Sequence, residues 1–265
     1  MDLGAGTFTN SGEIALGATS PSTAVLGISG SVTLNGGGAI LLSNQQNSIV
    51  GLASGAALTN VNDTIVGIGT VGNSKLSLTN EGTLEAHLGT LTVNTAGTIT
   101  NSGTLGSIDG DLIVDNSVSG TGNEQISSGG TLEFAASVSS GQTVTFANAG
   151  DTLKLDAAQN FSGTLVGLAA ASSSSFDAVD LANFKFADTT ITGVTGSGAA
   201  GTTTNVTLTD SVDHLTTTLQ LLNQYANQFA VNASDYSLTS DNAATPGTDF
   251  SVDYTPGTKN HGIGH

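Results

Sequence analysis

The chain has 265 residues, with 36 Gly, 3 Pro and no Cys, and it is rich in Thr, Ser, Asn, Val and Leu. These are strand and tight-turn residues, so the composition predicts an all-β protein; collagen is excluded because Gly has no strict three-residue period, and 37% hydrophobic residues argue against disorder. The formal charge of −17, with four Lys and no Arg, excludes nucleic acid as a partner, and no stretch approaches a membrane span, so we expect no membrane insertion.

Strand patterns with an Asn at the same phase recur along the first half of the chain. Asn10, Asn60, Asn80 and Asn101 each follow a short alternating pattern, in the segments Phe8–Ile14, Leu58–Ile65, Leu78–Leu84 and Ile99–Leu105. Asn tolerates the left-handed conformation at a corner, and equivalent amides in stacked coils can hydrogen-bond to one another. We therefore expect these four residues to form a structural turn ladder. The alternative is a set of ordinary hairpin turns, in which Asn and Gly are also common.

One repeat consists of three short alternating strands joined by polar turns, at 75–79, 83–86 and 90–93. Alternation indicates that each strand buries one face. Three such strands with their turns use roughly twenty residues, which fits one coil of a parallel β-helix, or β-solenoid. An antiparallel sandwich has similar strand spacing, but it gives no reason for the Asn context to recur at one phase. We predict β-solenoid repeats over residues 1–157.

The last part of the chain has a different texture. Two similar segments, Gly129–Phe134 and Ala149–Leu155, still follow the repeat, but aromatic residues and small-residue stretches become frequent after residue 157. The last coil of a solenoid exposes unpaired backbone and an open apolar core, so it needs a cap. We predict that residues 158–265 form the final irregular coils and a β-rich, aromatic-containing C-terminal cap.

The repeats contain the phrases Ser31–Gly38, Leu58–Ile65, Val118–Gly122 and Gly130–Phe134. Together with the later segments 156–161, 177–181, 221–225 and 237–241, they resemble the repeat blocks of large proteobacterial surface proteins of the autotransporter passenger and haemagglutinin-like adhesin type. The resemblance implies a structural or adhesive rod, secreted or attached to the bacterial cell surface. It implies extracellular glycans or copies of the chain itself as partners, and it carries no catalytic residue.

Polysaccharide-binding and polysaccharide-degrading proteins also use β-helices, and they are the alternative. Paired carboxylates serve such enzymes as acid and base, and they can also hold calcium. The best acidic cluster is Asp109, Asp111 and Asp115, where alternation places Asp111 and Asp115 on one strand face; the plainer interpretation is a solvated strand face. Because Arg is absent and no convergent acid–base set is visible, we expect no enzymatic activity. We expect no cofactor, and calcium bound by Asp109, Asp111 and Asp115 is the alternative.

Binding of ice or ordered water is a third hypothesis, because Thr-x-Thr strands occur at 7–9, 98–100 and 143–145. Such binding needs a flat array with the Thr side chains in register on one face. The irregular separations of these strands along the sequence argue against it, and Thr is an ordinary residue of exposed strands.

Overall fold

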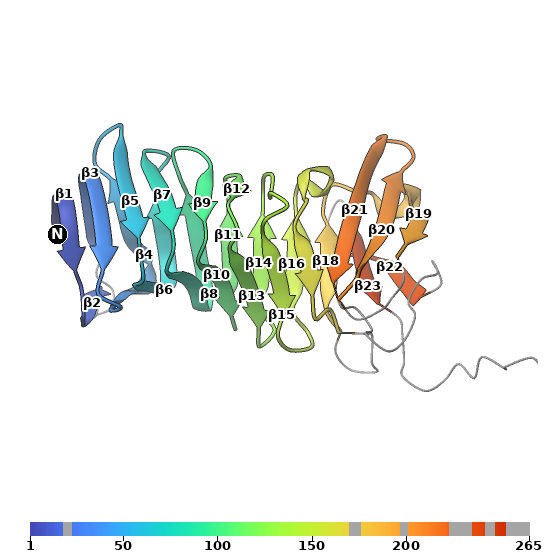
Figure 1. Cartoon of the computed structure of the whole chain (residues 1–265), viewed down its shortest axis with the longest axis horizontal. Helices are drawn as coiled ribbons and strands as arrows, with labels where there is room; N and C mark the ends of the chain where they lie inside the picture. Colours follow the sequence, from blue (N-terminus) through green and yellow to red (C-terminus); the bar gives the residue numbers. More distant parts are fainter. Residues whose placement is uncertain (18–22, 170–175, 197–200, 223–234, 242–246, 253–265) are drawn as a thin grey trace, which may run out of the picture.

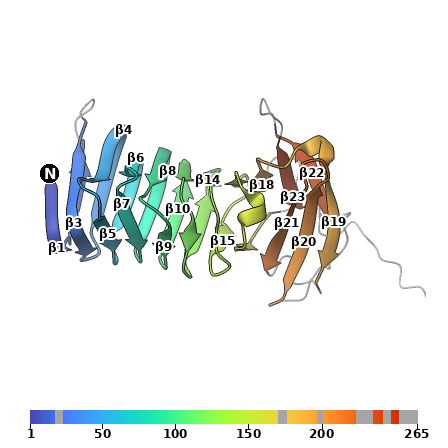
Figure 2. The same ribbon diagram turned by 90° about the horizontal axis from the view of Figure 1, so that it is seen from above.

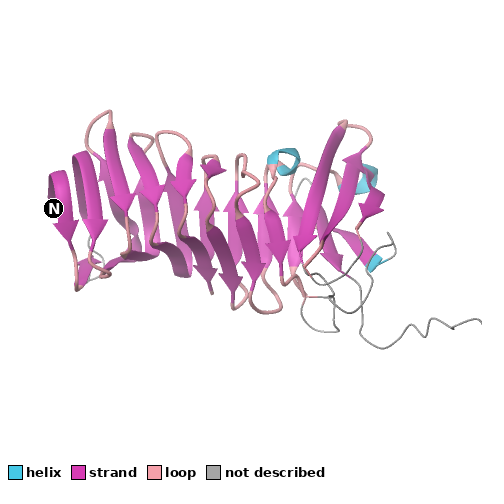
Figure 3. Ribbon diagram, viewed as in Figure 1, coloured by secondary structure: helices cyan, strands magenta, loops and turns pink. Residues whose placement is uncertain are grey.

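The computed structural model describes residues 1–17, 23–169, 176–196, 201–222, 235–241 and 247–252, and most of them are β-strand (Figures 1 and 3). The strands stack along one axis as about eight parallel coils of about 21 residues each. The N-terminus lies at one end of the resulting rod, as two views at right angles show (Figure 2). The predicted all-β solenoid is therefore confirmed.

Each coil has three faces, because strands pair with strands one coil away in three separate columns. The first face contains parts of β1 (Asp2–Thr9) and β3 (Val25–Asn35), then β5 (Ala56–Asn60), β7 (Leu76–Asn80), β9 (Ile99–Asn101) and β12 (Val118–Ser119). The second contains β2 (Glu13–Leu16), the first parts of β4 (Ala39–Gly51), β6 (Thr64–Gly72) and β8 (Thr83–Asn94), then β10 (Thr104–Ile108), β13 (Asn123–Ser127), β15 (Thr143–Phe146) and β17 (Thr164–Val166). The third contains the remaining parts of β1, β3, β4, β6 and β8, then β11 (Asp111–Val114), β14 (Thr131–Phe134), β16 (Thr152–Leu155) and β18 (Ala178–Leu181).

Several strands turn a corner without a loop. The sequence predicts separate strands at 83–86 and 90–93, whereas the structure has one strand, β8, that runs from the second face to the third. The bend is at Leu88, whose φ of 58° lies in the left-handed region. A single residue in that region reverses the direction of the side chains locally, so the chain turns while both parts of the strand stay paired.

The core consists of inward-facing columns to which each coil adds one side chain. One column on the third face is fully buried and in register from coil to coil: Leu26, Ile49, Val71, Val93, Val114, Phe134, Leu155 and Leu181. Burial of each such side chain stabilises the fold by roughly 1.5–3 kcal/mol. Alternation alone therefore specifies the interior, because every second residue of each strand joins a column.

Antiparallel strands cover the C-terminal end of the rod. β21 (Leu215–Leu222) continues the second face next to β17, followed by β20 (Thr203–Asp210) and β19 (Thr189–Thr195), while β23 (Thr248–Val252) and β22 (Tyr236–Ser240) extend the third face from β18. The rings of Tyr236 and Phe250 stack with centroids 5.3 Å apart. Two short 3-10 helices, η1 (Ala158–Asn160) and η2 (Phe186–Asp188), lie between the strands. Residues 223–234 and 253–265 of the predicted cap lie outside the described residues.

Candidate functional site

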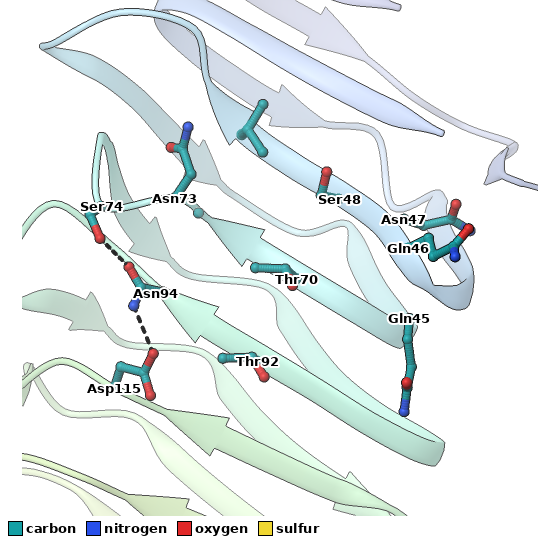
Figure 4. A pocket seen from close by; sticks show the side chains of 12 residues that line it. Gln45, Gln46, Asn47, Ser48, Thr70, Asn73, Ser74, Thr92, Asn94 and Asp115 are labelled. Carbon is teal, nitrogen blue, oxygen red and sulfur yellow. Dashed lines mark hydrogen bonds between the residues drawn. The ribbon is translucent and has the colours of Figure 1, made fainter. Parts of the chain in front are cut away.

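A polar groove of about 600 Å³ lies on the third face of the rod, across β4, β6, β8 and the end of β11 (Figure 4). Its floor is an outward column of three hydroxyl side chains, Ser48, Thr70 and Thr92, which are partners in register in successive coils. The spacing between them is therefore the coil spacing of roughly 4.8 Å. Val50 adds an apolar surface beside this column.

One wall of the groove is a bulge in β4. Between Ser43 and Ser48, four residues of β4 stand opposite a single residue of β6, so the additional residues project outward and carry Gln45 and Gln46. Asn47 fixes the bulge from inside. Its fully buried amide donates to the Leu16 carbonyl at 2.7 Å and accepts from the Ala24 N–H at 3.0 Å.

The opposite wall is the corner at Asn73 and Ser74. The Asn73 side chain makes two hydrogen bonds to Gly51 in the preceding coil. Its Oδ1 accepts from the Gly51 N–H at 3.1 Å, and its Nδ2 donates to the Gly51 carbonyl at 3.0 Å. The Ser74 hydroxyl donates to Asn94 Oδ1 at 2.5 Å, and Asn94 Nδ2 donates to Asp115 Oδ2 at 2.7 Å (Figure 4). This chain of hydrogen bonds links three coils and ends on the one carboxylate among the twelve lining residues.

The structure brings three of the predicted ladder residues together inside the rod. Asn60, Asn80 and Asn101 are register partners and fully buried. Asn60 Nδ2 donates to Asn80 Oδ1 at 3.0 Å, and Asn80 Nδ2 donates to Asn101 Oδ1 at 2.9 Å. The amides also bind the corner backbone; Asn80 Nδ2, for example, donates to the Thr104 carbonyl at 3.0 Å. The ladder thus joins neighbouring coils and holds one corner of each.

Asn10 is not brought into this ladder. Phe8, Leu34 and Asn60 are successive partners in register, so apolar residues occupy the ladder position in the first two coils. Asn10 lies two residues beyond that position, where its Nδ2 donates to the Ala39 carbonyl at 3.2 Å. The expectation for Asn10 rested on the similarity of its segment, which does not fix the register between coils.

Two further residues, which the sequence analysis missed, extend the ladder. Asn101 Nδ2 donates to Glu124 Oε1 and to Gln142 Oε1, both at 3.1 Å, and Gln142 Nε2 donates back to the Asn101 carbonyl at 3.1 Å. Glu124 is fully buried in a column between Leu105 and Val144, and its Oε2 has no hydrogen-bond partner in the described part of the chain. Burial raises the pKa of Glu124 to about 8, against the opposing effect of hydrogen bonds from Asn101 and the backbone. An acidic residue in an otherwise aliphatic column was the signal in the sequence.

The three carboxylates proposed for calcium stay apart. Asp109 lies in the turn before β11 with a φ of 49°, Asp111 accepts a hydrogen bond from the Thr90 hydroxyl at 3.4 Å, and Asp115 accepts from Asn94. Asp111 and Asp115 share the outward face as predicted, but they are four positions apart along the chain, which separates them by roughly 13 Å. One ion with ligands at roughly 2.4 Å cannot bind both. Within the described ranges, no three His, Cys, Asp or Glu side chains are placed to hold a metal ion.

Threonine side chains form an outward column on the first face. Thr7, Thr33, Thr59, Thr79 and Thr100 are successive register partners, and Ser119 follows in the next coil. Their separations in the sequence are unequal because the loops of successive coils differ in length. Only Thr7 and Thr100 of this column belong to the Thr-x-Thr strands singled out in the sequence. Irregular spacing in the sequence therefore conceals a regular spacing in the structure.

Comparison with protein-family models gives no match, and comparison with curated proteins gives no significant match. The resemblance to bacterial surface proteins therefore stays an expectation. Among the described residues, no helix has the length and apolar character needed to cross a membrane.

Proposed function

We propose that the chain is a structural or adhesive segment of a secreted or surface-attached bacterial protein, and that it binds extracellular glycans without turning them over. The groove on the third face carries this proposal. Ser48, Thr70 and Thr92 offer hydroxyls that both donate and accept, at intervals fixed by the coils. Sugars present hydroxyls at regular intervals too, so a glycan can match several groups of a rigid groove at once.

The rigidity of the scaffold supports a structural role. The amide ladder through Asn60, Asn80 and Asn101 joins coils inside the core, where a satisfied hydrogen-bond network favours one register. The chain has no Cys, so this rod needs no disulfide to fold outside the cell. Copies of the chain itself are further candidate partners, since end coils of solenoids present strand edges that can pair.

The carboxylates support a binding role rather than an enzymatic one. Glycoside hydrolysis needs two carboxyl groups that flank the bond to be broken. Asp115 is the one carboxylate among the residues that line the groove, and it already accepts a hydrogen bond from Asn94.

Calorimetric titration with neutral gluco- and xylo-oligosaccharides tests the binding proposal. Replacing Thr70 and Thr92 together by Val removes two hydroxyls and keeps the shape, so affinity should fall roughly tenfold or more. Ser77→Ala on the first face removes an exposed hydroxyl outside the groove and serves as the control. Glycan binding through the groove is refuted if no oligosaccharide binds, or if the control weakens binding as much as the double variant.

The threonine column on the first face favours a second candidate function, which is binding of ordered water or ice. The column is in register over six coils and consists of uncharged side chains that combine a hydroxyl with, in Thr, a methyl group. We expect the chain to inhibit ice recrystallisation. Thr59→Lys, which changes the first face, should abolish this inhibition, and Thr92→Lys, which changes the third face, should retain it. Equal activity of both variants would reject the column as the binding face.

A further inference from the structure

The hydrogen bonds in the groove wall have a direction. Ser74 donates to Asn94, and Asn94 donates to Asp115, so both steps point toward the carboxylate. Asn94 thereby uses its Oδ1 and one Nδ2 hydrogen within the wall. An ionised carboxylate only accepts hydrogen bonds and has about four lone-pair positions, of which Asn94 occupies one. Asp115, which is half-buried, therefore offers the ligand an acceptor with a negative charge.

The residues that line the groove carry one acidic group and no basic group. Toward the C-terminal end, the floor column continues in register from Thr92 through Ile113 to Glu133 and Lys154, whose charges offset each other. Lys154, the one cation of this column, lies 3.1 Å from Glu133 and 3.4 Å from Asp156. None of the twelve groove residues is Lys or Arg, and the chain carries a formal charge of −17. The field at the groove therefore opposes acidic sugars and favours a cation.

From these two observations, we propose that the groove selects glycans built from amino sugars with free amino groups, and that Asp115 receives the ammonium group. This inference rests on the proposed glycan binding and specifies its ligand class. The sugar hydroxyls would pair with Ser48, Thr70 and Thr92, while one face of a sugar ring lies against Val50. Asp115 lies at the edge of that floor, two residues beyond Ile113, which is the register partner of Thr92. One oligosaccharide can therefore contact both the hydroxyl column and the Asp115 carboxylate.

The half-exposed position of Asp115 limits the size of the effect. Ion pairs that water reaches are weak, and a preference of about fivefold for the amino form over its N-acetylated form is expected at low salt. The preference should shrink as salt is added, because screening reduces the attraction between exposed charges. A basic peptide could offer the same ammonium group, but it lacks the hydroxyls that match the floor.

The experiment compares short glucosamine oligomers with their fully N-acetylated counterparts by calorimetric titration at mildly acidic pH. The variant is Asp115→Asn, whose amide oxygen can still accept from Asn94, and the matched control is Asp111→Asn, which removes a charge on the same face outside the groove. The fivefold preference should disappear in Asp115→Asn and persist in Asp111→Asn. Circular dichroism of both variants checks that the coils remain folded.

The other outcomes separate the two proposals. Equal affinity of the unchanged chain for both oligomers would overturn the amino-sugar assignment and leave glycan binding intact. An equal loss of preference in both variants would also overturn it, because the whole acidic surface rather than Asp115 would then select the ligand. Binding of oligolysine in place of any oligosaccharide would overturn the assignment and the proposed glycan binding together.

Discussion

Glu124 should make the rod less stable as the pH rises toward neutrality and beyond. Its carboxyl group is fully buried between Leu105 and Val144, and burial raises its pKa from an ordinary 4.5 to about 8. Below pH 4.5 the group is protonated in both the folded and the unfolded chain, and it contributes its full stability. Between these two pKa values the unfolded chain releases the proton and the folded chain keeps it, so the free energy of unfolding falls.

The magnitude follows from the two pKa values. At about 1.4 kcal/mol per pH unit, a window from 4.5 to about 8 corresponds to a loss of roughly 5 kcal/mol, most of it between pH 5 and pH 8. Such a loss is a large part of the stability of an ordinary domain. Burial also raises the pKa of Asp180, to about 7, and of Glu133 and Asp249, so these groups act in the same direction.

Glu124→Gln isolates the contribution of the one residue. Gln keeps the oxygen that accepts from Asn101 and cannot ionise, so the variant should gain stability relative to the unchanged chain by about 4 kcal/mol between pH 5 and pH 8. Urea denaturation followed by circular dichroism at both pH values measures this difference, with the exposed Glu81→Gln as the control. A stability difference between the two proteins that is the same at pH 5 and pH 8 would refute the reasoning.

Two further predictions concern the coil corners. Asn80→Ala removes one amide–amide hydrogen bond from Asn60 and one from Asn101, and it should lower the free energy of unfolding by roughly 2–4 kcal/mol in urea denaturation. Ser77→Ala, an exposed change on the same strand, should leave this free energy within about 0.5 kcal/mol. A neutral Asn80→Ala would show that the ladder contributes nothing. Gly103→Ala places a methyl group against the Gly82 carbonyl and should lower the melting temperature. Gly97→Ala is the control, because its added methyl group meets no atom within 4 Å and should leave the melting temperature unchanged. Equal melting temperatures of the two variants would contradict the close stacking of the coil corners.

The fold could be predicted from the sequence because each repeat contains the pattern of one coil. Alternation defines the buried face, and the equal phase of Asn60, Asn80 and Asn101 matches their register. The groove could not be predicted in this way, because it depends on a bulge in β4 and on Asn94 and Asp115 meeting across a corner. Loops of unequal length also shift the register between coils by amounts that the sequence does not reveal. For this reason the sequence wrongly predicted Asn10 as a member of the ladder, and it did not show that the threonine residues of the first face are aligned.

We propose that the groove on the third face is the binding surface of the rod. Backbone amide NMR spectra of the isotope-labelled chain, recorded during titration with a glucosamine oligomer, test this proposal. We expect the largest shift changes on five residues that line the groove: Ser48, Thr70, Thr92, Asn94 and Asp115. Changes confined to the first face, or spread evenly over the acidic surface, would contradict it.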